Sequence, residues 1–65
     1  MKNNFSKNLI SLRSVNEIGQ IQLAKEIGVS KGTISLWENG LREPTLSNLI
    51  ALANFFNISL DELVE

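Results

Sequence analysis

The sequence predicts an all-α fold, a compact bundle of five short helices. Apolar residues recur every three or four positions, which is the spacing of one face of a helix. Serine or threonine precedes several of these segments, where a hydroxyl can cap a helix N-terminus. Glycine, asparagine and the single proline, Pro44, separate the segments as turn-forming residues do.

The first helix is expected from about Phe5 to Val15. Leu9 and Leu12 follow Phe5 at the i+4 and i+7 positions, so the three side chains share a face that we expect to point into the core. The next two residues, 16–17, are expected to end this helix.

The second and third helices are expected at Gln20 to Ile27 and Lys31 to Asn39, joined by a three-residue turn. Gly28 suits a helix that ends in the left-handed conformation, Val29 is expected to be buried, and Ser30 can cap the following helix. The apolar positions of the two helices are Leu23, Ala24, Ile27, Ile34 and Trp37. Because helices this short must cross closely to bury such faces, and Ala24 permits a close approach, the segment 20–39 is a helix-turn-helix motif.

The fourth and fifth helices follow a loop that contains Gly40 and Pro44. Thr45 is expected to cap the fourth helix, Asn57 to end it in a left-handed conformation, and Ser59 to cap a final helix from Leu60 to Val64. The expected core side of the fourth helix consists of Leu46, Leu49, Ile50, Ala53 and Phe56.

The composition of the sequence limits the classes of function that we expect for this chain. The 65 residues, 43% of them hydrophobic, predict one domain over residues 1–65, in which about 60% of the unfolded surface is buried. The chain has no cysteine, no histidine and no glycine-rich phosphate loop, so we expect no enzyme activity, metal or other cofactor. It also has no apolar run near the roughly 20 residues of a membrane span and no signal peptide, so we expect a cytoplasmic protein without membrane contact.

The chain resembles the phage repressor and Cro type of DNA-binding domain. The shared pattern is Gln20, Leu23-Ala24, Gly28, Val29-Ser30, Ile34-Ser35, Trp37 to Gly40 and Pro44, and the likeness extends over residues 9–13 and 46–63. The resemblance implies a lambda-repressor-like fold and a transcriptional regulator, a repressor first of all, that binds a double-stranded DNA operator as a homodimer. It also implies a structural ion pair between Arg13 and Glu38, and nothing indicates a small-molecule effector.

The exposed face of the third helix is the predicted base-contacting surface. At about 100° per residue, this face carries Gly32, Ser35, Leu36 and Asn39, with Lys31 beside them. Lys31 can donate to guanine and Leu36 can lie against a thymine methyl, and we expect base contacts at Lys31, Gly32, Ser35 and Leu36. Glycine at position 32 indicates either fewer direct contacts or a closer backbone approach.

Five polar residues around the motif are expected to contact DNA phosphates: Gln20, Ser30, Thr33, Asn39 and Arg42. The resemblance implies this role for all five. At Gln20 it implies a contact through the side chain and the amide, aided by the free amides of a helix N-terminus. Gly19 stands where the resembled pattern commonly has threonine or serine, and glycine is a weaker cap. Plainer roles stay open: Lys31, Ser35 and Arg42 can be solvated surface residues, and Leu36 can cover a neighbouring helix.

The net charge of the chain favours an alternative to DNA binding. The net charge is −1 and the isoelectric point about 5.3, whereas DNA-binding domains are usually basic. Residues 1–60 nevertheless hold six basic and four acidic groups, because Asp61, Glu62 and Glu65 lie at the C-terminal end. The alternative is a protein-interaction or antitoxin-like module on the same scaffold.

A homodimer would place two copies on DNA half-sites about 34 Å apart. The candidate interface residues are Leu41, Leu60 and Val64, the apolar positions least clearly assigned to the core, although a small shift in helix register would bury them.

Overall fold

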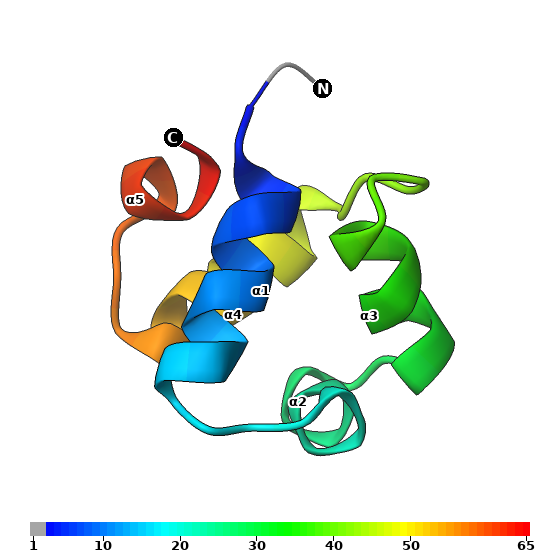
Figure 1. The fold of residues 1–65 in the computed structure, drawn as a ribbon. Helices are drawn as coiled ribbons and strands as arrows, with labels where there is room; N and C mark the ends of the chain where they lie inside the picture. The colour runs from blue at the N-terminus through cyan, green and yellow to red at the C-terminus, as the bar shows by residue number, and fades with distance from the viewer. Residues whose placement is uncertain (1–2) are drawn as a thin grey trace.

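The computed structural model describes residues 3–65, and it has the predicted all-α architecture (Figure 1). The helices in chain order are α1 Phe5–Val15, α2 Gln20–Ile27, α3 Lys31–Glu38, α4 Leu46–Phe56 and α5 Leu60–Val64. The expected end of the third helix is wrong by one residue. Asn39 is the C-cap, because the left-handed Gly40 that follows it, at φ 70°, cannot continue a right-handed helix.

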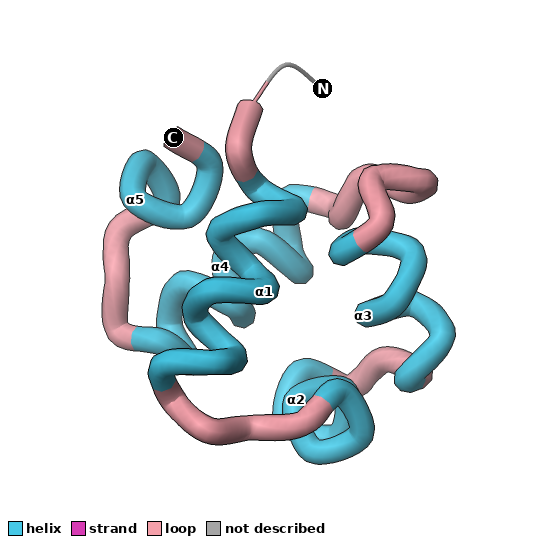
Figure 2. Tube along the Cα trace, in the orientation of Figure 1, coloured by secondary structure: helices cyan, strands magenta, loops and turns pink. Residues whose placement is uncertain are grey.

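α1 lies in the middle of the molecule, with α3 packed on one side and α5 on the other (Figure 1, Figure 2). α2 packs against α3 and α4, and α4 also packs against α5. The amide of Asn4 donates to the carbonyl of Val64 at 3.0 Å, and its Nδ2 donates to the carbonyl of Glu65 at 2.7 Å. These bonds join the start of α1 to the end of α5, so α5 is held on the side of α1 away from α3.

Hydroxyl side chains begin three of the helices, as predicted. Ser30, Thr45 and Ser59 each accept a hydrogen bond from the backbone amide three residues later. At α5 the bond is reciprocal, because Glu62 Oε1 accepts from the amide of Ser59 at 3.0 Å. Each cap satisfies an amide that has no partner inside its own helix.

Left-handed residues follow four of the helices, with Gly40 after α3 already described. Gly28 ends α2 at φ 82° and Asn57 ends α4 at φ 57°, both as predicted. Glu17, just beyond α1, also has a positive φ of 52°. The amide of Ile18 then donates to the carbonyl of Arg13 at 3.0 Å, which directs the chain from α1 toward α2.

Nine apolar residues form the core: Phe5, Leu9, Leu23, Ala24, Ile34, Trp37, Leu52, Ala53 and Leu63. They come from all five helices, and the rings of Phe5 and Trp37 meet edge to face with centroids 6.2 Å apart. Leu12 is half-buried against this core, in agreement with its predicted inward face. No helix of residues 3–65 has both the length and the apolar character needed to cross a membrane.

The predicted core face of α4 is partly wrong. Leu46 and Ile50 are 65% and 44% exposed, whereas Leu52, which the prediction omitted, is completely buried. The prediction holds for Ala53, and Leu49 and Phe56 are half-buried against the core. α4 is apolar around most of its circumference, so residue spacing alone does not select which side faces inward.

The three candidate interface residues differ in their exposure to solvent. Val64 is half-buried and packs against the core, whereas Leu60 is 38% exposed and Leu41 is 74% exposed. Val64 contributes to the packing between α5 and the rest of the bundle, so only two of the three candidate interface residues are open to solvent.

Candidate nucleic-acid interface

α2 and α3 meet through the turn at residues 28–30. The amides of Gly28 and Val29 both donate to the carbonyl of Ala24, at 2.8 and 3.0 Å. Ala24 is only 3% exposed, and its small side chain allows the two helices to cross closely. Val29 is half-buried against the core, less completely than the sequence suggested, because a turn residue has solvent on one side.

Glu38, the last residue of α3, lies at the centre of a hydrogen-bonded cluster that joins three helices. We call this cluster of Arg13, Gln20 and Glu38 the bracket. Arg13 of α1 donates to it twice, from Nε to Oε2 and from Nη2 to Oε1, the latter at 3.0 Å. Gln20, the first residue of α2, donates from Nε2 to Oε1 at 2.9 Å. The expected ion pair between Arg13 and Glu38 is therefore present. Gln20 adds a third hydrogen bond to Glu38, which sequence reasoning missed. A two-point guanidinium–carboxylate contact fixes direction as well as distance, so the bracket orients the end of α3.

The bracket is shielded from solvent, with side-chain exposures of 20% for Arg13 and 7% for Glu38. Burial raises the pKa of the Glu38 carboxyl, but the hydrogen bonds from Arg13 and Gln20 and the guanidinium charge outweigh it, so the pKa lies below its usual value. The pKa of Arg13 is raised, mainly by its hydrogen bond to Glu38. Both groups are therefore charged at neutral pH.

A second contact, also missed in the sequence, ties α3 to α1. Ser6 Oγ donates to the carbonyl of Trp37 at 2.6 Å. With Trp37 buried and Glu38 in the bracket, the last turn of α3 is held by side chains from both neighbouring helices. The end of α3 is therefore fixed by polar contacts from α1 and α2 as well as by apolar packing.

The outer side of α3 carries the four predicted base-contacting residues. Lys31 and Gly32 are exposed at its start, and Ser35 and Leu36 are half-buried farther along. The inner side is formed by residues whose side chains are no more than 1% exposed, namely Ile34 and Trp37. The structure thus brings the four residues to one helix, with the first turn the most accessible part.

Gly32 has no structural requirement within the free protein. A Cβ added there would meet only Ser30 Oγ, at an ordinary contact distance of 3.8 Å, and the residue does not have a positive φ. Open space above this position is therefore available to a ligand that approaches the backbone of α3.

Two polar pairs at the ends of α3 include most of the predicted phosphate contacts. Ser30 Oγ lies 2.9 Å from Thr33 Oγ1 and accepts from the amide of Thr33 at 3.1 Å. Asn39 Nδ2 donates to the carbonyl of Ser35 at 2.9 Å. These bonds use part of the hydrogen-bonding capacity of each pair and hold both pairs in fixed positions.

The N-terminus of α2 differs from that of α3, because Gly19 offers no side-chain acceptor to its first-turn amides. Gln20 donates one Nε2 hydrogen to Glu38, and the second N–H of the same amide group is not used by that bond. This N–H and the backbone amides of the turn are both suited to an anion.

Arg42 is exposed in the loop that connects α3 to α4. This residue borders a recess of about 60 Å³, whose other lining residues are Asn3, Phe5, Ser6, Gly40 and Glu43. The loop therefore places a cationic side chain just beyond the end of the predicted base-contacting helix.

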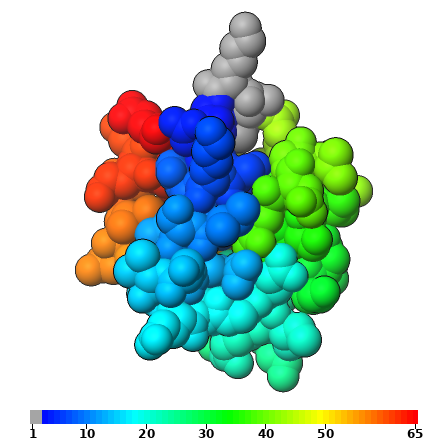
Figure 3. Space-filling view, in the orientation of Figure 1, coloured from blue at the N-terminus to red at the C-terminus, as the bar shows by residue number. Residues whose placement is uncertain are grey.

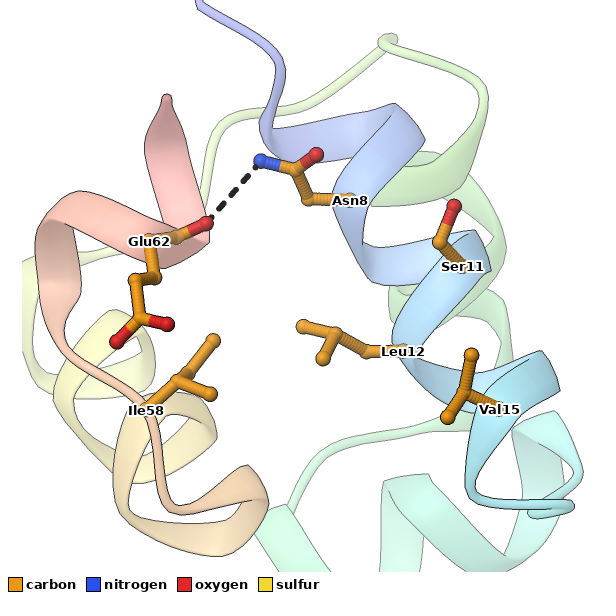
Figure 4. A pocket seen from close by; sticks show the side chains of 6 residues that line it. All are labelled: Asn8, Ser11, Leu12, Val15, Ile58 and Glu62. Carbon is orange, nitrogen blue, oxygen red and sulfur yellow. Dashed lines mark hydrogen bonds between the residues drawn. The ribbon is translucent and has the colours of Figure 1, made fainter.

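A larger apolar groove lies between α1 and α5, away from α3 (Figure 4). Its volume is about 240 Å³, and its lining residues are Asn8, Ser11, Leu12, Val15, Ile58 and Glu62. Asn8 Nδ2 donates to the carbonyl of Glu62 at 3.3 Å across one end of the groove. Residues 3–65 contain no group of three or more histidine, cysteine, aspartate or glutamate side chains able to hold a metal ion, and the groove has no acid–base pair.

The close crossing of α2 and α3, together with the exposed outer side of α3, defines a helix-turn-helix domain. The chain belongs to the helix-turn-helix family, whose pattern matches residues 18–63.

Three comparisons show the range of proteins that this chain resembles. It is 37% identical over 60 residues to the HTH-type transcriptional activator BcrR of Enterococcus faecalis, over 92% of this chain and 29% of BcrR. The P22 c2 repressor, solved in complex with a synthetic operator, superposes with a TM-score of 0.88 at 34% identity, over 94% of this chain and 92% of that one. Hydroxypropylphosphonic acid epoxidase from S. wedmorenis superposes with a TM-score of 0.86 at 28% identity, over 95% of this chain and 33% of that one.

The chain spans 29% to 54% of the length of the first curated relatives it matches. The similarity therefore establishes the fold and the family for this region. The same helical unit occurs within an activator, a repressor and an epoxidase, so the function must be argued from the site.

Proposed function

We propose that this chain is a sequence-specific regulator of transcription that binds double-stranded DNA and places α3 in the major groove of an operator. The observation that carries the proposal is that α3 is held at its inner side and at its end while its outer side is exposed. Its inner side is anchored by Trp37, its end is held by Arg13 and Glu38, and its outer side is left open with small or flexible side chains. The likeness to the P22 c2 repressor in complex with an operator supports the same use of α3 here.

In this proposal the side chains of α3 divide into two groups. Lys31 donates to guanine O6 or N7, Leu36 contacts a thymine methyl, Ser35 contacts a base edge, and Gly32 lets the backbone approach the bases. Each well-made side-chain contact is expected to discriminate against the wrong base by about 1–3 kcal/mol. The phosphate contacts come from Gln20, Ser30, Thr33, Asn39 and Arg42, and they position the domain without selecting a sequence.

We propose a homodimer, because one domain of this size contacts few base pairs and two half-sites raise both affinity and specificity. We place repression before activation, since a domain bound over a promoter needs no further surface in order to block it. The absence of histidine and cysteine from the sequence supports a binding rather than a catalytic role.

The acidic isoelectric point favours the alternative, a module that binds a protein partner. The positions of the acidic side chains argue against this alternative. Asp61, Glu62 and Glu65 lie on or just after α5, on the other side of α1 from α3, and Glu38 is paired with Arg13. The side that carries α3 therefore keeps Lys31 and Arg42 without the three C-terminal carboxylates.

The test is selection from a pool of random double-stranded DNA, followed by titration of binding in salt. The Lys31→Ala/Leu36→Ala double variant is compared with Lys7→Ala/Val15→Ala, a matched control that removes the same kinds of side chain from the exposed surface of α1. We expect the wild type and the control to enrich one sequence and the α3 variant to lose that enrichment. Arg42→Ala should lower the salt slope by about one without changing the enriched sequence.

A folded wild-type protein that binds no DNA at low salt would overturn the proposal and favour the protein-interaction module. Equal loss of enrichment in the α3 variant and the α1 control would show that α3 is not the base-contacting helix.

A further inference from the structure

The groove between α1 and α5 has apolar walls that the packing of the bundle leaves uncovered. Leu12 and Val15 line it from α1, and Ile58, in the link between α4 and α5, lines it from the opposite side (Figure 4). Leu12 and Ile58 also pack against the core, whereas Val15 is 80% exposed. Apolar side chains that gather around a recess, rather than lying singly on a surface, are typical of a place where a ligand or partner binds.

The polar groups of the groove are mainly hydrogen-bond acceptors. Asn8 Nδ2 donates to the carbonyls of Glu62 and Leu63, at 3.3 and 2.9 Å, so its Oδ1 is left as an acceptor. Oε1 of Glu62 accepts from the amide of Ser59, and its Oε2 has no hydrogen-bond partner within residues 3–65. Among the six described residues that line the groove, none is a lysine or arginine.

The charge around the groove is negative. Four carboxylates belong to the groove or to the segments that continue its walls: Glu17, Asp61, Glu62 and Glu65. α1 carries two cationic residues, but Arg13 is already paired with Glu38, and Lys7 does not line the groove. The field of these carboxylates therefore attracts a cationic group to a recess whose walls are apolar.

We propose that the groove between α1 and α5 binds a segment of another protein in which one or two apolar side chains stand next to lysine or arginine. The apolar side chains pack against Leu12, Val15 and Ile58, and the cation pairs with Glu62. The volume of about 240 Å³ fits this occupant. A cavity of about 150 Å³ already accepts a benzene-sized group, whereas drug-sized molecules occupy sites of about 300–1,000 Å³.

The charge of the groove disfavours three other occupants. DNA phosphates and anionic lipid headgroups would be repelled by the carboxylates. A second copy in a two-fold contact would bring Asp61 and Glu62 toward their own counterparts. A basic segment of a different protein is attracted where these three are repelled, so charge complementarity selects it.

α1 separates the groove from the proposed DNA-contacting helix. In the space-filling view, the orange to red atoms of α5 lie on one side of the blue atoms of α1, and the green atoms of α3 lie on the other (Figure 3). A segment in the groove therefore leaves the outer side of α3 open, and both surfaces can be occupied at once. The groove thus adds a protein contact to the proposed function and does not replace it.

The first experiment is selection of short random peptides displayed on phage, with the whole chain as the target. Many peptide copies on one particle make a weak contact detectable. Selection is repeated with Ser11→Lys, which places a cation in the groove, and with Ser47→Lys, a matched control at an exposed serine of α4. We expect the wild type and Ser47→Lys to enrich peptides with an apolar residue next to lysine or arginine, and Ser11→Lys to lose this enrichment.

The position of the contact is measured with one selected peptide and isotopically labelled protein. The peptide should shift the amide NMR signals of residues 8–15 and 58–62 and leave those of residues 31–36 unchanged. Signals of residues 8–15 and 58–62 that instead move with protein concentration alone would assign the groove to a second copy and overturn the proposal.

The role of charge is tested with Glu62→Gln, because glutamine can keep the capping box with Ser59 while removing the negative charge. Glu26→Gln removes the same charge from the exposed surface of α2 and is the matched control. At low salt, the affinity of the selected peptide should fall by up to about fivefold with Glu62→Gln alone, as for a partly exposed ion pair. The difference should disappear at high salt.

The outcomes separate this inference from the proposed function, since peptide selection uses no DNA. Enrichment that needs the groove in a protein that binds no DNA would support the inference and overturn the proposed function. Three results would overturn the inference: no enriched peptide on the folded wild type, enrichment of acidic or wholly polar peptides, or equal enrichment on Ser11→Lys and Ser47→Lys.

Discussion

α3 and α4 follow one another in the chain, and each leaves one side exposed, but the two helices are held in different ways. The last turn of α3 receives hydrogen bonds from Ser6, Arg13 and Gln20, so polar contacts of defined geometry set its orientation. α4 is held largely by apolar packing of Leu52 and Ala53, which has no direction of its own. A surface that must match a ligand atom by atom benefits from the first kind of support, whereas a surface that only has to be covered can rely on the second.

The largest expected effect on stability distinguishes the buried side of α4 from its exposed side. Leu52→Ala removes a completely buried side chain and should lower the free energy of unfolding by about 2–5 kcal/mol, enough to unfold much of a domain this small. Ile50→Ala, at a position 44% exposed, should cost under about 1 kcal/mol. Urea unfolding followed by circular dichroism measures both. Similar losses in the two variants would mean that α4 is rotated relative to the described packing.

The next effect tests the polar support of α3. Glu38→Gln keeps the shape of the side chain but leaves the guanidinium of Arg13 without its counter-ion, so we expect a loss of about 1–3 kcal/mol at neutral pH. The pKa of Glu38 is lowered in the folded protein, so its contribution is present above the unfolded value of about 4.3 and is lost as the pH falls below it. The stability difference between wild type and variant should therefore shrink as the pH is lowered through this range.

The control for this measurement is Glu26→Gln on α2, an exposed glutamate that accepts a hydrogen bond only from its helical neighbour Gln22 in the described contacts. This change should cost a few tenths of a kcal/mol at most. A gap between wild type and Glu38→Gln that stays constant down to strongly acidic pH would contradict the assigned charge of Glu38.

The contrast between α3 and α4 also explains what the sequence could predict. The helix starts at Ser30, Thr45 and Ser59 and the ends at Gly28 and Asn57 were predictable, because each depends on the local chemistry of one residue. The open side of α3 was predictable too, since that helix has polar residues opposite its apolar ones.

What escaped prediction depends on contacts between segments far apart in the chain. The inward side of α4 could not be chosen, because its apolar residues fit more than one rotation, and only packing against α2 and α5 decides between them. The contacts Ser6–Trp37 and Gln20–Glu38 join residues 31 and 18 positions apart and use side chains that are ordinary on any surface. A polar residue at the start of a helix is a weak signal for such a bond, since most remain solvated.

A smaller effect on stability is expected from the N-caps of α3 and α4. Ser30→Ala and Thr45→Ala each remove one side-chain acceptor at a helix N-terminus, so each should lower the free energy of unfolding by about 1 kcal/mol. Their effects on DNA affinity should differ, because Ser30 stands at the start of the proposed recognition helix. We expect weaker DNA binding from Ser30→Ala alone, measured at a temperature where both variants are fully folded. Equal affinities would remove Ser30 from the phosphate-contacting set.

The smallest effect has the opposite sign and concerns Gly32. Gly32→Ala should raise the free energy of unfolding by about 0.5–1 kcal/mol, because alanine lowers the conformational entropy of the unfolded chain and its methyl group meets only Ser30 Oγ at 3.8 Å. Thermal unfolding gives the stability, and titration with the selected operator gives the affinity. Weaker operator binding by this more stable protein would show that DNA approaches the backbone of α3 closely at this position. Unchanged binding would show that the bases are contacted elsewhere on the helix, since a methyl group is too small to disturb a contact that does not reach it.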